Sequence, residues 1–438
     1  MKEIIKTILY DWTAREMPPF LLPRAINLAP YLGLMPRKII TLTGFRRSGK
    51  TYLGLYTIER LLKKFSREEV IYINFEDERI PLRTDFLTNL LPTIKEVFGK
   101  PPKILFLDEV QNIPQWGKWL RRVYDENPGI IFFVTGSSSK MSSQEIPTEL
   151  RGRCLEIKVS PLSFSEFLDF KNIKINLEAV SSSQNQKAEL SRALNEYLHY
   201  GALPEVVLSH ESRKMEILQQ YYQTVIQKDI VERFQIKNQE GLKALLRLLL
   251  NSTAYSFGKL YNTLKSLNYR IGKTTLLNYV SHIETSYFLE SLPIFSYKIK
   301  DQLQYSRKAY FIDNGFINAL STNFSENLGR LAENLVFIDL RREANNQSAF
   351  FYWKDVSGKE IDFVIKQGLK IKQLLQVCWD IFNVDTKKRE VSALIKASEE
   401  LRCNNLLIIT SDYEAEEKIK GKTISYIPLW RWLLQEKI

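Results

Sequence analysis

A glycine-rich octapeptide, GFRRSGKT at residues 44–51, constrains the fold more than any other feature of this sequence. It matches the pattern G-x-x-x-x-G-K-[ST]. The β-branched run at residues 38–44 predicts a strand, and the segment after the octapeptide spaces its apolar residues at helical intervals. A strand, a glycine loop and a helix in this order let backbone N–H groups and the positive helix end surround a phosphate. The N-terminal part is therefore predicted to bind a nucleotide.

The residues of this loop have separate expected roles. Lys50 is expected to reach the terminal phosphates and to act in catalysis, and the hydroxyl of Thr51 is expected to ligate Mg²⁺. ATP and Mg²⁺ are therefore the predicted ligands. The other predicted nucleotide-binding residues are the neighbours of Lys50 in the loop and on the helix: Gly44, Arg46, Arg47, Ser48, Gly49 and Tyr52.

A second acidic element follows at residues 103–111, KILFLDEVQ, which reads as a buried strand ending in Asp108 and Glu109. A carboxylate at such a strand end can hold the water shell of Mg²⁺, and the next one can orient the water that attacks the γ-phosphate. Asp108 is thus predicted to serve the metal, and Glu109 to be catalytic. The alternative is an acidic strand end that is merely solvated. The combination of this acidic pair with Lys50 favours ATP hydrolysis.

Further polar groups follow the next predicted strand, at residues 129–140. The hydroxyls of Ser137 and Ser138 are available there to sense the γ-phosphate. Arg151 or Arg153 could reach the phosphate of a neighbouring subunit as an arginine finger, because a cation there stabilises charge in the transition state. That role would require at least a homodimer. The alternative is a pair of arginines bound to nearby carboxylates.

The chain resembles archaeal and bacterial AAA-type ATPases that carry a C-terminal nuclease-like domain, in five successive segments: LTGFRRSGKTYL, INFEDERI, LFLDEVQNIPQW, VTGSSSKM and LRGR…PLSFSEFL. This resemblance implies an α/β fold with an ATPase domain at residues 1–170, in which the sheet is parallel and the phosphate-loop strand is central. It also implies that residues 15–24 lie near the adenine and that a helical lid follows at residues 171–235.

Residues 236–325 are predicted to form a winged-helix module, because three short helical stretches precede two apolar, aromatic strands. Between residues 235 and 310 there are 11 Lys and Arg against 4 Asp and Glu, which is most of the net charge of +12. A localised excess favours DNA as the partner, although winged helices also dock proteins. The residues expected to contact DNA lie at the start of the second helix and in the wing at residues 296–313: Lys273, Thr274, Thr275, Asn278, Lys298, Lys300, Arg307 and Lys308.

Residues 326–438 resemble the PD-(D/E)xK nuclease fold, with Glu333 and Asp362 at the positions of the metal-binding carboxylates. The third element should read acid-x-Lys, but here it reads Gln376-Val377-Cys378. Glutamine ligates Mg²⁺ weakly, so Gln376 belongs to a degenerate metal site at most. The lost acid and lysine favour a domain that binds nucleic acid or protein without cutting, and an active nuclease is the alternative. Three lysines could stand in for the missing one: Lys359, Lys366 and Lys372.

Composition narrows the class of protein further. No apolar run approaches the ~18 residues of a membrane helix, so a soluble cytoplasmic protein is expected. The three cysteines are far apart and odd in number, which argues against a disulfide framework or a zinc knuckle. The leading interpretation is an ATPase coupled to DNA binding. Its rival is a nucleotide-gated signalling switch that acts through protein partners.

Overall fold

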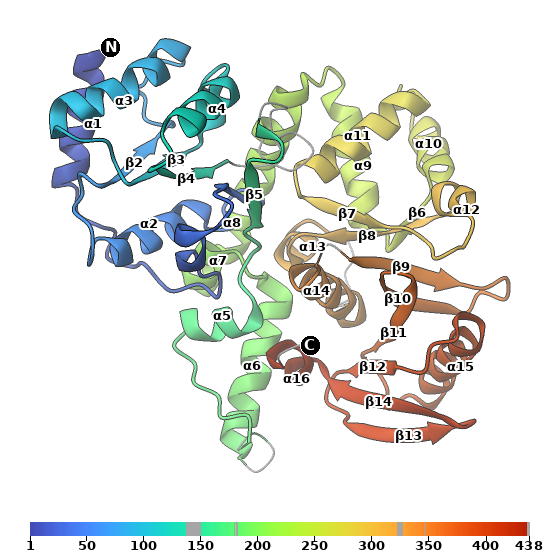
Figure 1. Cartoon of the computed structure of the whole chain (residues 1–438). Helices are drawn as coiled ribbons and strands as arrows, with labels where there is room; N and C mark the ends of the chain where they lie inside the picture. The colour runs from blue at the N-terminus through green and yellow to red at the C-terminus, as the bar shows by residue number, and fades with distance from the viewer. Residues whose placement is uncertain (137–149, 179, 181–182, 322–326, 346, 436–438) are drawn as a thin grey trace. The chain divides into compact units, whose positions relative to one another are not determined.

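The computed structural model describes residues 1–136, 150–178, 180, 183–321, 327–345 and 347–435 (Figure 1). The chain divides into two compact units, Met1–Pro161 and Leu162–Ile438. The first unit holds the nucleotide-binding motifs. The second unit holds the segments predicted as lid, winged helix and nuclease-like domain. Among the described residues, no helix is both long and apolar enough to cross a membrane.

The first unit is built on a five-stranded parallel sheet in the order β2-β3-β4-β1-β5. This confirms the predicted α/β core. Strand β1 is paired on both sides, but the middle strand is β4, so the phosphate-loop strand is interior rather than central. Runs of apolar residues suit strands that are buried on both faces. The strands are β1 (Ile39–Thr43), β2 (Val70–Asn74), β3 (Ile104–Asp108), β4 (Ile131–Thr135) and β5 (Cys154–Lys158).

Helices cover both faces of this sheet (Figure 1). Helix α2 packs on one face, where Leu53 and Ile58 meet Phe106 in a buried cluster. Helices α1, α3 and α4 pack on the other face, where Leu9 and Leu90 lie in a second cluster. The helical elements are α1 (Lys2–Ala14), η1 (Ala29–Gly33), α2 (Lys50–Leu61), α3 (Thr84–Phe98), η2 (Val110–Asn112) and α4 (Trp116–Glu126).

Helix α1 adds an element that the motif analysis does not predict. Its buried residues Ile5, Ile8, Leu9 and Trp12 follow the spacing of one helical face. The charged residues between them occupy the opposite face. This segment therefore completes the core of the first unit.

The second unit begins with a group of helices in the region predicted as a lid. Helix α6 contacts α13 and α14, and α8 contacts α13, so this segment packs within the second unit. The elements of this region are α6 (Gln184–Tyr200), α7 (Pro204–Leu208), α8 (Glu211–Thr224) and the π-helical η5 (Val225–Glu232). The helix before it is α5 (Phe164–Phe170), and the later helices are α13 (Asn314–Leu320) and α14 (Leu328–Arg342).

A buried aspartate joins the end of α6 to the start of α13. Asp313 accepts hydrogen bonds from the N–H of Ala202 at 2.6 Å and the N–H of Gly315 at 2.8 Å. Gly201 has φ of +75°, and a Cβ there would lie 1.7 Å from Oδ1 of Asp313, so only glycine fits. Burial raises the pKa of Asp313 to about 7, while its two backbone hydrogen bonds act in the opposite direction.

Up to residue 313, the predicted winged-helix segment contains four helices and an antiparallel sheet in the order β6-β8-β7. The expected wing at residues 296–313 is not a simple extended hairpin, because a short helix, α12, lies between β7 and β8. The elements are α9 (Gln239–Leu250), β6 (Ala254–Tyr255), α10 (Phe257–Ser266), α11 (Lys273–Thr285), β7 (Leu289–Leu292), α12 (Ile299–Gln304) and β8 (Arg307–Phe311).

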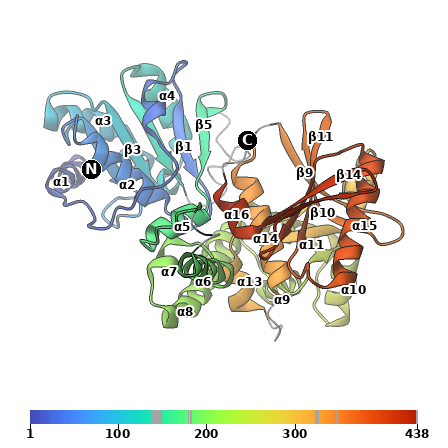
Figure 2. The same ribbon diagram turned by 90° about the horizontal axis from the view of Figure 1, so that it is seen from below.

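The C-terminal part contains a six-stranded mixed sheet in the order β13-β14-β12-β11-β10-β9. Helices α14 and α15 lie on opposite sides of it (Figure 2). Strand β13 is an element that the sequence reading does not predict, because three of its five residues are consecutive charged residues and none of the five is buried. The further elements are β9 (Ser348–Lys354), β10 (Glu360–Gln367), β11 (Lys370–Cys378), α15 (Val384–Leu401), β12 (Leu406–Thr410), β13 (Ala415–Ile419), β14 (Lys422–Pro428) and α16 (Leu429–Leu434).

Candidate functional site

The phosphate loop connects β1 to α2, and both of its glycines are required by geometry. Gly44 has φ of +140°, and a Cβ there would lie 2.2 Å from the carbonyl oxygen of Val159. Gly49 has φ of +95° and immediately precedes α2. Any other residue at either position would be strained, which explains why glycine occupies both.

Lys50, the first residue of α2, lies across its own loop. Its Nζ donates hydrogen bonds to the carbonyl oxygens of Phe45 at 2.9 Å and Gly44 at 3.0 Å, and its side chain is buried. Because a buried ammonium needs partners, these carbonyl groups hold the side chain in the loop. The ammonium is thus positioned where the sequence motif requires a cation.

The hydroxyl of Thr51 and the carboxylate of Asp108 lie next to each other, as expected for two residues that serve one metal. Thr51 Oγ1 donates to Asp108 Oδ2 at 2.9 Å. Tyr72 also donates to Oδ2, at 2.7 Å, and the hydroxyl of Thr135 donates to Oδ1. Burial raises the pKa of Asp108, whereas the hydrogen bonds from Thr135 and Tyr72 lower it. Oxygen atoms of this kind are the ligands that Mg²⁺ prefers, so this pair fits the ion.

Glu109 follows directly in an unusual backbone conformation. Its φ is +58°, in the left-handed region that residues other than glycine seldom adopt. Its N–H is held by the carbonyl oxygen of Thr135 at 3.1 Å, and its carboxylate accepts a hydrogen bond from the side chain of Gln111. The last residue of β4 therefore helps to orient both acidic residues.

Three residues of this site are missing from the sequence prediction: Tyr72, Gln111 and Thr135. Tyr72 lies on β2 and Thr135 ends β4, and these strands flank β3. The carboxyl ends of parallel strands meet at one edge of a sheet, so Thr135 could have been found from the predicted strand before the serine cluster. No sequence pattern of this kind indicated that Tyr72 lies at the site.

The other predicted nucleotide-binding residues lie in or beside the loop. Arg46 is half-buried, Arg47 and Tyr52 are exposed, and Ser48 is buried. The predicted sensor residues Ser137 and Ser138 lie outside the described residues.

The segment expected near the adenine ends at the phosphate loop. Arg24 donates from Nη1 to the carbonyl oxygen of Ser48 at 3.0 Å and from Nη2 to that of Ser160 at 2.9 Å. This places the end of residues 15–24 against the loop.

The two candidate arginine fingers differ in their surroundings. Arg153 forms a two-point pair with Asp125, with Nε 3.1 Å from Oδ1 and Nη2 3.2 Å from Oδ2. Arg151 is exposed. The pair with a nearby carboxylate, which was the alternative interpretation, therefore describes Arg153 within this chain.

In the second unit, Lys308 lies among three carboxylates of the segment that was predicted to be nuclease-like. Its Nζ is 2.7 Å from Asp362 Oδ1, 2.9 Å from Glu333 Oε1 and 2.9 Å from Glu360 Oε1. Lys308 is only 4% exposed. Burial lowers the pKa of a lysine, but the charges of Asp362 and Glu333 outweigh it and raise the pKa of Lys308 well above its ordinary value. The prediction that Lys308 binds DNA phosphate is therefore wrong, since its ammonium faces the interior.

The backbone explains how a residue of β8 comes to this place. The chain that leaves β7 adds to the edge of β9: the N–H of Phe295 donates to the Tyr352 carbonyl oxygen at 2.6 Å, and the Tyr352 N–H donates to that of Pro293 at 3.1 Å. This bridge joins the three-stranded and six-stranded sheets. It brings β8 beside the acidic residues of α14 and β10.

The carboxylates and Gln376 were expected to form a degenerate metal site, and they do not fit a divalent cation as they stand. Gln376 Oε1 accepts the N–H of Asp362 at 3.0 Å, and its Nε2 donates to Glu390 at 2.6 Å. Asp362 Oδ2 accepts the N–H of Val377 at 2.9 Å. The ammonium of Lys308 fills the space between the acids. In the described part of the chain, no group of three or more His, Cys, Asp or Glu residues is arranged to hold a metal.

The three lysines that were expected to replace the missing catalytic lysine do not contact the carboxylates of this cluster. Lys359 donates from Nζ to Ser392 Oγ at 2.5 Å. Lys366 on β10 is partly exposed, and Lys372 on β11 is exposed. The lysine that contacts all three carboxylates, Lys308, comes instead from a segment that was predicted to bind DNA.

The remaining residues expected to contact DNA are accessible to different degrees. Helix α11 begins at Lys273 and buries one face, and the predicted contact residues on it are exposed except for half-buried Thr275. Arg307 is half-buried, 5.4 Å from the ring of Phe257. The exposed members of the set are Lys273, Thr274, Asn278, Lys298 and Lys300.

Three family models match successive parts of the chain. An AAA domain matches residues 36–168, which include the phosphate loop, Asp108 and Glu109. Two domains of unknown function follow, DUF8612 at residues 191–327 and DUF4143 at residues 328–432.

Among solved structures, the Walker-type ATPase PABY2304 of Pyrococcus abyssi is similar over 69% of this chain and 99% of its own, at 13% identity and a TM-score of 0.41. The Aeropyrum pernix ORC1 protein, solved in complex with DNA, is similar over 72% and 91%, at 15% identity and a TM-score of 0.31. These values are too low to carry a functional comparison.

Two relatives align with nearly the whole chain. The protein of Haemophilus influenzae described as uncharacterized is 28% identical over 411 residues, covering 91% of this chain and 94% of its own. "Uncharacterized protein MJ1544" of Methanocaldococcus jannaschii is 39% identical over 421 residues, covering 94% of this chain and 91% of its own. The chain therefore belongs to the protein family of MJ1544, and its N-terminal part is an AAA-type P-loop ATPase domain.

Proposed function

We propose that this protein binds ATP with Mg²⁺, hydrolyses it and couples the nucleotide cycle to DNA binding. The observation that carries the first part is the 2.9 Å hydrogen bond between the hydroxyl of Thr51 and the carboxylate of Asp108, next to the buried ammonium of Lys50. These are the three groups that a P-loop ATPase uses for the metal and the terminal phosphates.

The chemistry follows from these side chains. Thr51 and Asp108 would hold Mg²⁺, which supplies positive charge to the phosphate oxygens when bound. Lys50 can exchange its two carbonyl partners for phosphate oxygens without leaving the loop. Glu109 then orients the attacking water, and the hydrogen bonds of Thr135 keep both acids in position.

Substitution of Lys50 tests this proposal. Lys50→Ala is expected to reduce ATP turnover by about a hundredfold or more, because a cation at the transition-state charge is lost. Lys64→Ala, at an exposed lysine beyond the same helix, is the matched control and should keep normal turnover. Radioactive phosphate release and fluorescent ATP-analogue binding would be measured for both. Normal turnover in Lys50→Ala would refute ATP hydrolysis at this loop.

The DNA part of the proposal is supported by the exposed start of α11. Lys273, Thr274 and Asn278 are accessible there, on a helix whose other face is buried in the second unit. Helix starts of this kind can enter the major groove. Duplex DNA is expected to stimulate ATP turnover in a manner that weakens steeply with salt, and Lys273→Glu should abolish most of the stimulation.

A second candidate function is a nucleotide-gated switch that acts on proteins. Large apolar side chains are exposed between β7 and β8, where a wing would contact DNA: Tyr297, Ile299, Leu303 and Tyr305. Such a group suits a protein-docking surface. ATP turnover that is indifferent to DNA at all salt concentrations, with no measurable DNA binding, would favour this candidate.

We further propose that the nuclease-like segment does not cut DNA, because the ammonium of Lys308 occupies the place of a metal ion among Glu333, Glu360 and Asp362. Plasmid incubated with the protein and Mg²⁺ or Mn²⁺ is expected to stay intact. Nicking that disappears in Asp362→Ala would overturn this part of the proposal and establish an active nuclease.

A further inference from the structure

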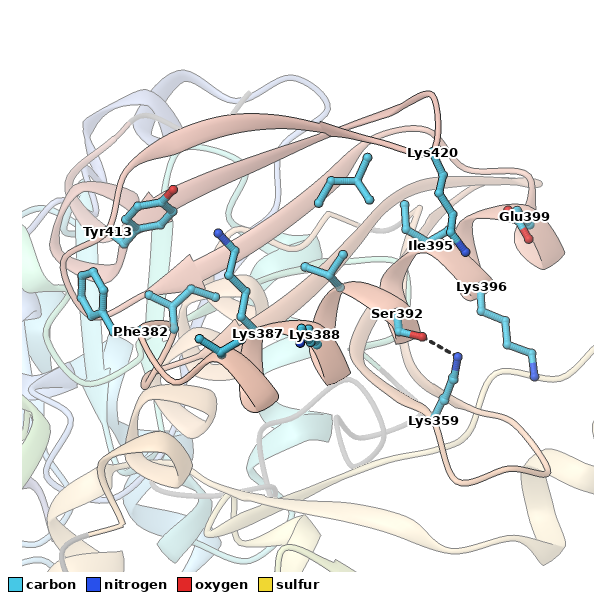
Figure 3. A pocket seen from close by; sticks show the side chains of 14 residues that line it. Lys359, Phe382, Lys387, Lys388, Ser392, Ile395, Lys396, Glu399, Tyr413 and Lys420 are labelled. Atoms are coloured by element: carbon cyan, nitrogen blue, oxygen red, sulfur yellow. Dashed lines mark hydrogen bonds between the residues drawn. The ribbon is translucent and has the colours of Figure 1, made fainter.

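A pocket of about 840 Å³ lies in the C-terminal part of the second unit, and none of the acidic residues of the cluster described above lines it. It is formed by α15, by the residues before that helix, and by β13 with the turn after it (Figure 3). Its volume falls in the usual range for a ligand-binding site. Glu399 is the one carboxylate among its lining residues. Five of the lining residues are lysines: Lys359, Lys387, Lys388, Lys396 and Lys420.

Three of these lysines already have partners. Lys387 lies 2.5 Å from Glu417, Lys396 pairs with Asp355, and Lys359 donates to Ser392. For Lys388 and Lys420, in contrast, no ion pair or hydrogen bond links the side chain to any described residue, and both are exposed. The pocket therefore keeps an excess of positive charge, which favours an anionic ligand.

The remaining lining is apolar and aromatic. Ile381, Val391 and Ile395 line it, and the ring of Phe382 is 71% exposed beside Tyr413, with centroids 5.9 Å apart at 78°. Figure 3 shows the two aromatic rings and Lys387 at one end of the pocket, and Lys359, Lys396 and Lys420 toward the other end. An accessible aromatic ring beside lysines combines a surface for stacking with cations for phosphate.

Tyr413 is fixed in place by its surroundings. Its hydroxyl donates to Glu417 at 2.9 Å, and Nζ of Lys387 lies 5.0 Å from its ring centroid. The ring of Phe382 rests against this fixed residue with most of its own surface exposed. The ring of Phe382 is thus already positioned for stacking, so binding a ligand there costs little conformational entropy.

We propose that this pocket binds a short segment of single-stranded nucleic acid, with phosphates at Lys388 and Lys420 and a base against Phe382. A single strand is favoured over a duplex because duplex bases are already stacked on each other and cannot offer a face to the ring. The proposal rests on the proposed function only in taking nucleic acid as the partner, and it does not depend on α11.

The test measures binding of a fluorescein-labelled dT20 oligonucleotide to the full-length protein by anisotropy. Lys388→Glu with Lys420→Glu is expected to weaken binding about tenfold or more and to reduce the salt slope by about 1.4. Phe382→Ala is expected to weaken it about fivefold or more. Lys418→Glu is the matched control for charge, since Lys418 is exposed on β13 and does not line the pocket. It should bind almost normally.

Further arms separate this proposal from the function proposed above. Lys273→Glu should weaken duplex binding but leave dT20 binding unchanged. Unchanged dT20 binding in all the pocket variants would overturn the pocket proposal, whatever duplex DNA does. Displacement of dT20 by polyglutamate at equal charge concentration would also overturn it, in favour of an acidic protein ligand. Unaltered thermal unfolding and ATP turnover confirm that each variant is folded.

Discussion

Lys308 on β8 and Asp362 on β10 are 54 residues apart in the chain, yet Nζ of Lys308 lies 2.7 Å from Oδ1 of Asp362. Glu333 and Glu360 complete the group around the ammonium. A lysine is therefore the cation of a cluster whose acids resemble the ligands of a metal. The cluster also fastens the three-stranded sheet to the six-stranded one, so it has a structural role that does not require catalysis.

Replacement of Lys308 is expected to destabilise the second unit strongly. Lys308→Met leaves Glu333 and Asp362 without their cation, whereas Glu360 keeps its pair with Lys354, and breaking a buried pair in this way costs about 3–5 kcal/mol. Urea unfolding followed by tryptophan fluorescence would measure the change. Lys300→Met, at an exposed lysine of α12, should change stability by less than about 0.5 kcal/mol.

A double variant checks the cause. Lys308→Met with Asp362→Asn removes one of the opposing charges, so it should recover part of the stability lost in Lys308→Met. Equal stability of Lys308→Met and the wild-type protein would show that the ion pairs contribute nothing.

Glu109→Gln is expected to separate ATP binding from hydrolysis. The amide keeps the size of the side chain but no longer accepts the proton of the attacking water, so turnover should fall about a hundredfold or more. ATP affinity should stay within about threefold, because Lys50 and Thr51 are unchanged. Glu68→Gln, at an exposed glutamate, serves as the control. Equal losses of binding and turnover would instead indicate that Glu109 holds the site together.

The two arginines before β5 should differ in their effect on turnover. Arg153 is half-exposed and paired with Asp125, so Arg153→Ala should change the free energy of unfolding by no more than about 1 kcal/mol and leave ATP turnover within about twofold. An arginine finger would cost about a thousandfold instead. Parallel assays of Arg151→Ala and Arg153→Ala, over a range of protein concentrations, would identify a finger that acts between subunits. A thousandfold loss in Arg153→Ala would contradict this expectation.

Asp313 should make stability depend on pH. Burial raises its pKa to about 7, whereas an aspartate in the unfolded chain titrates near about 4. Between these pH values the folded protein keeps a proton that the unfolded chain has released. The free energy of unfolding therefore falls as the pH rises from about 4 to about 7 and changes little above that.

Asp313→Asn removes this titration. The melting temperature of the wild-type protein should accordingly fall relative to that of the variant across the same interval, as measured by calorimetry. Asp380→Asn, at an exposed aspartate, should leave the pH dependence unchanged. A constant difference between wild type and Asp313→Asn from pH 4.5 to pH 7.5 would show that Asp313 does not titrate in this interval.

The sequence by itself determined the nucleotide end of the protein. A strand, a glycine loop and a helix are contiguous, and the glycines are required by backbone angles that other residues avoid, so the motif specifies its own conformation. Asp108 and Glu109 could be found because the apolar run of a buried strand ends directly before them in the sequence. The helix, hairpin and strand order around Glu333 and Asp362 was equally legible, since each element depends on local periodicity.

Only the tertiary structure decided which residues surround those acids. Lys308 looked like a surface lysine because its neighbours Lys300 and Arg307 are charged, and no local pattern records that β8 turns its side chain inward. Tyr72 and β13 were missed for the same reason: their partners, Asp108 and β14, are brought to them by strand pairing. Burial and long-range pairing are properties of the folded chain, and a local sequence pattern cannot contain them.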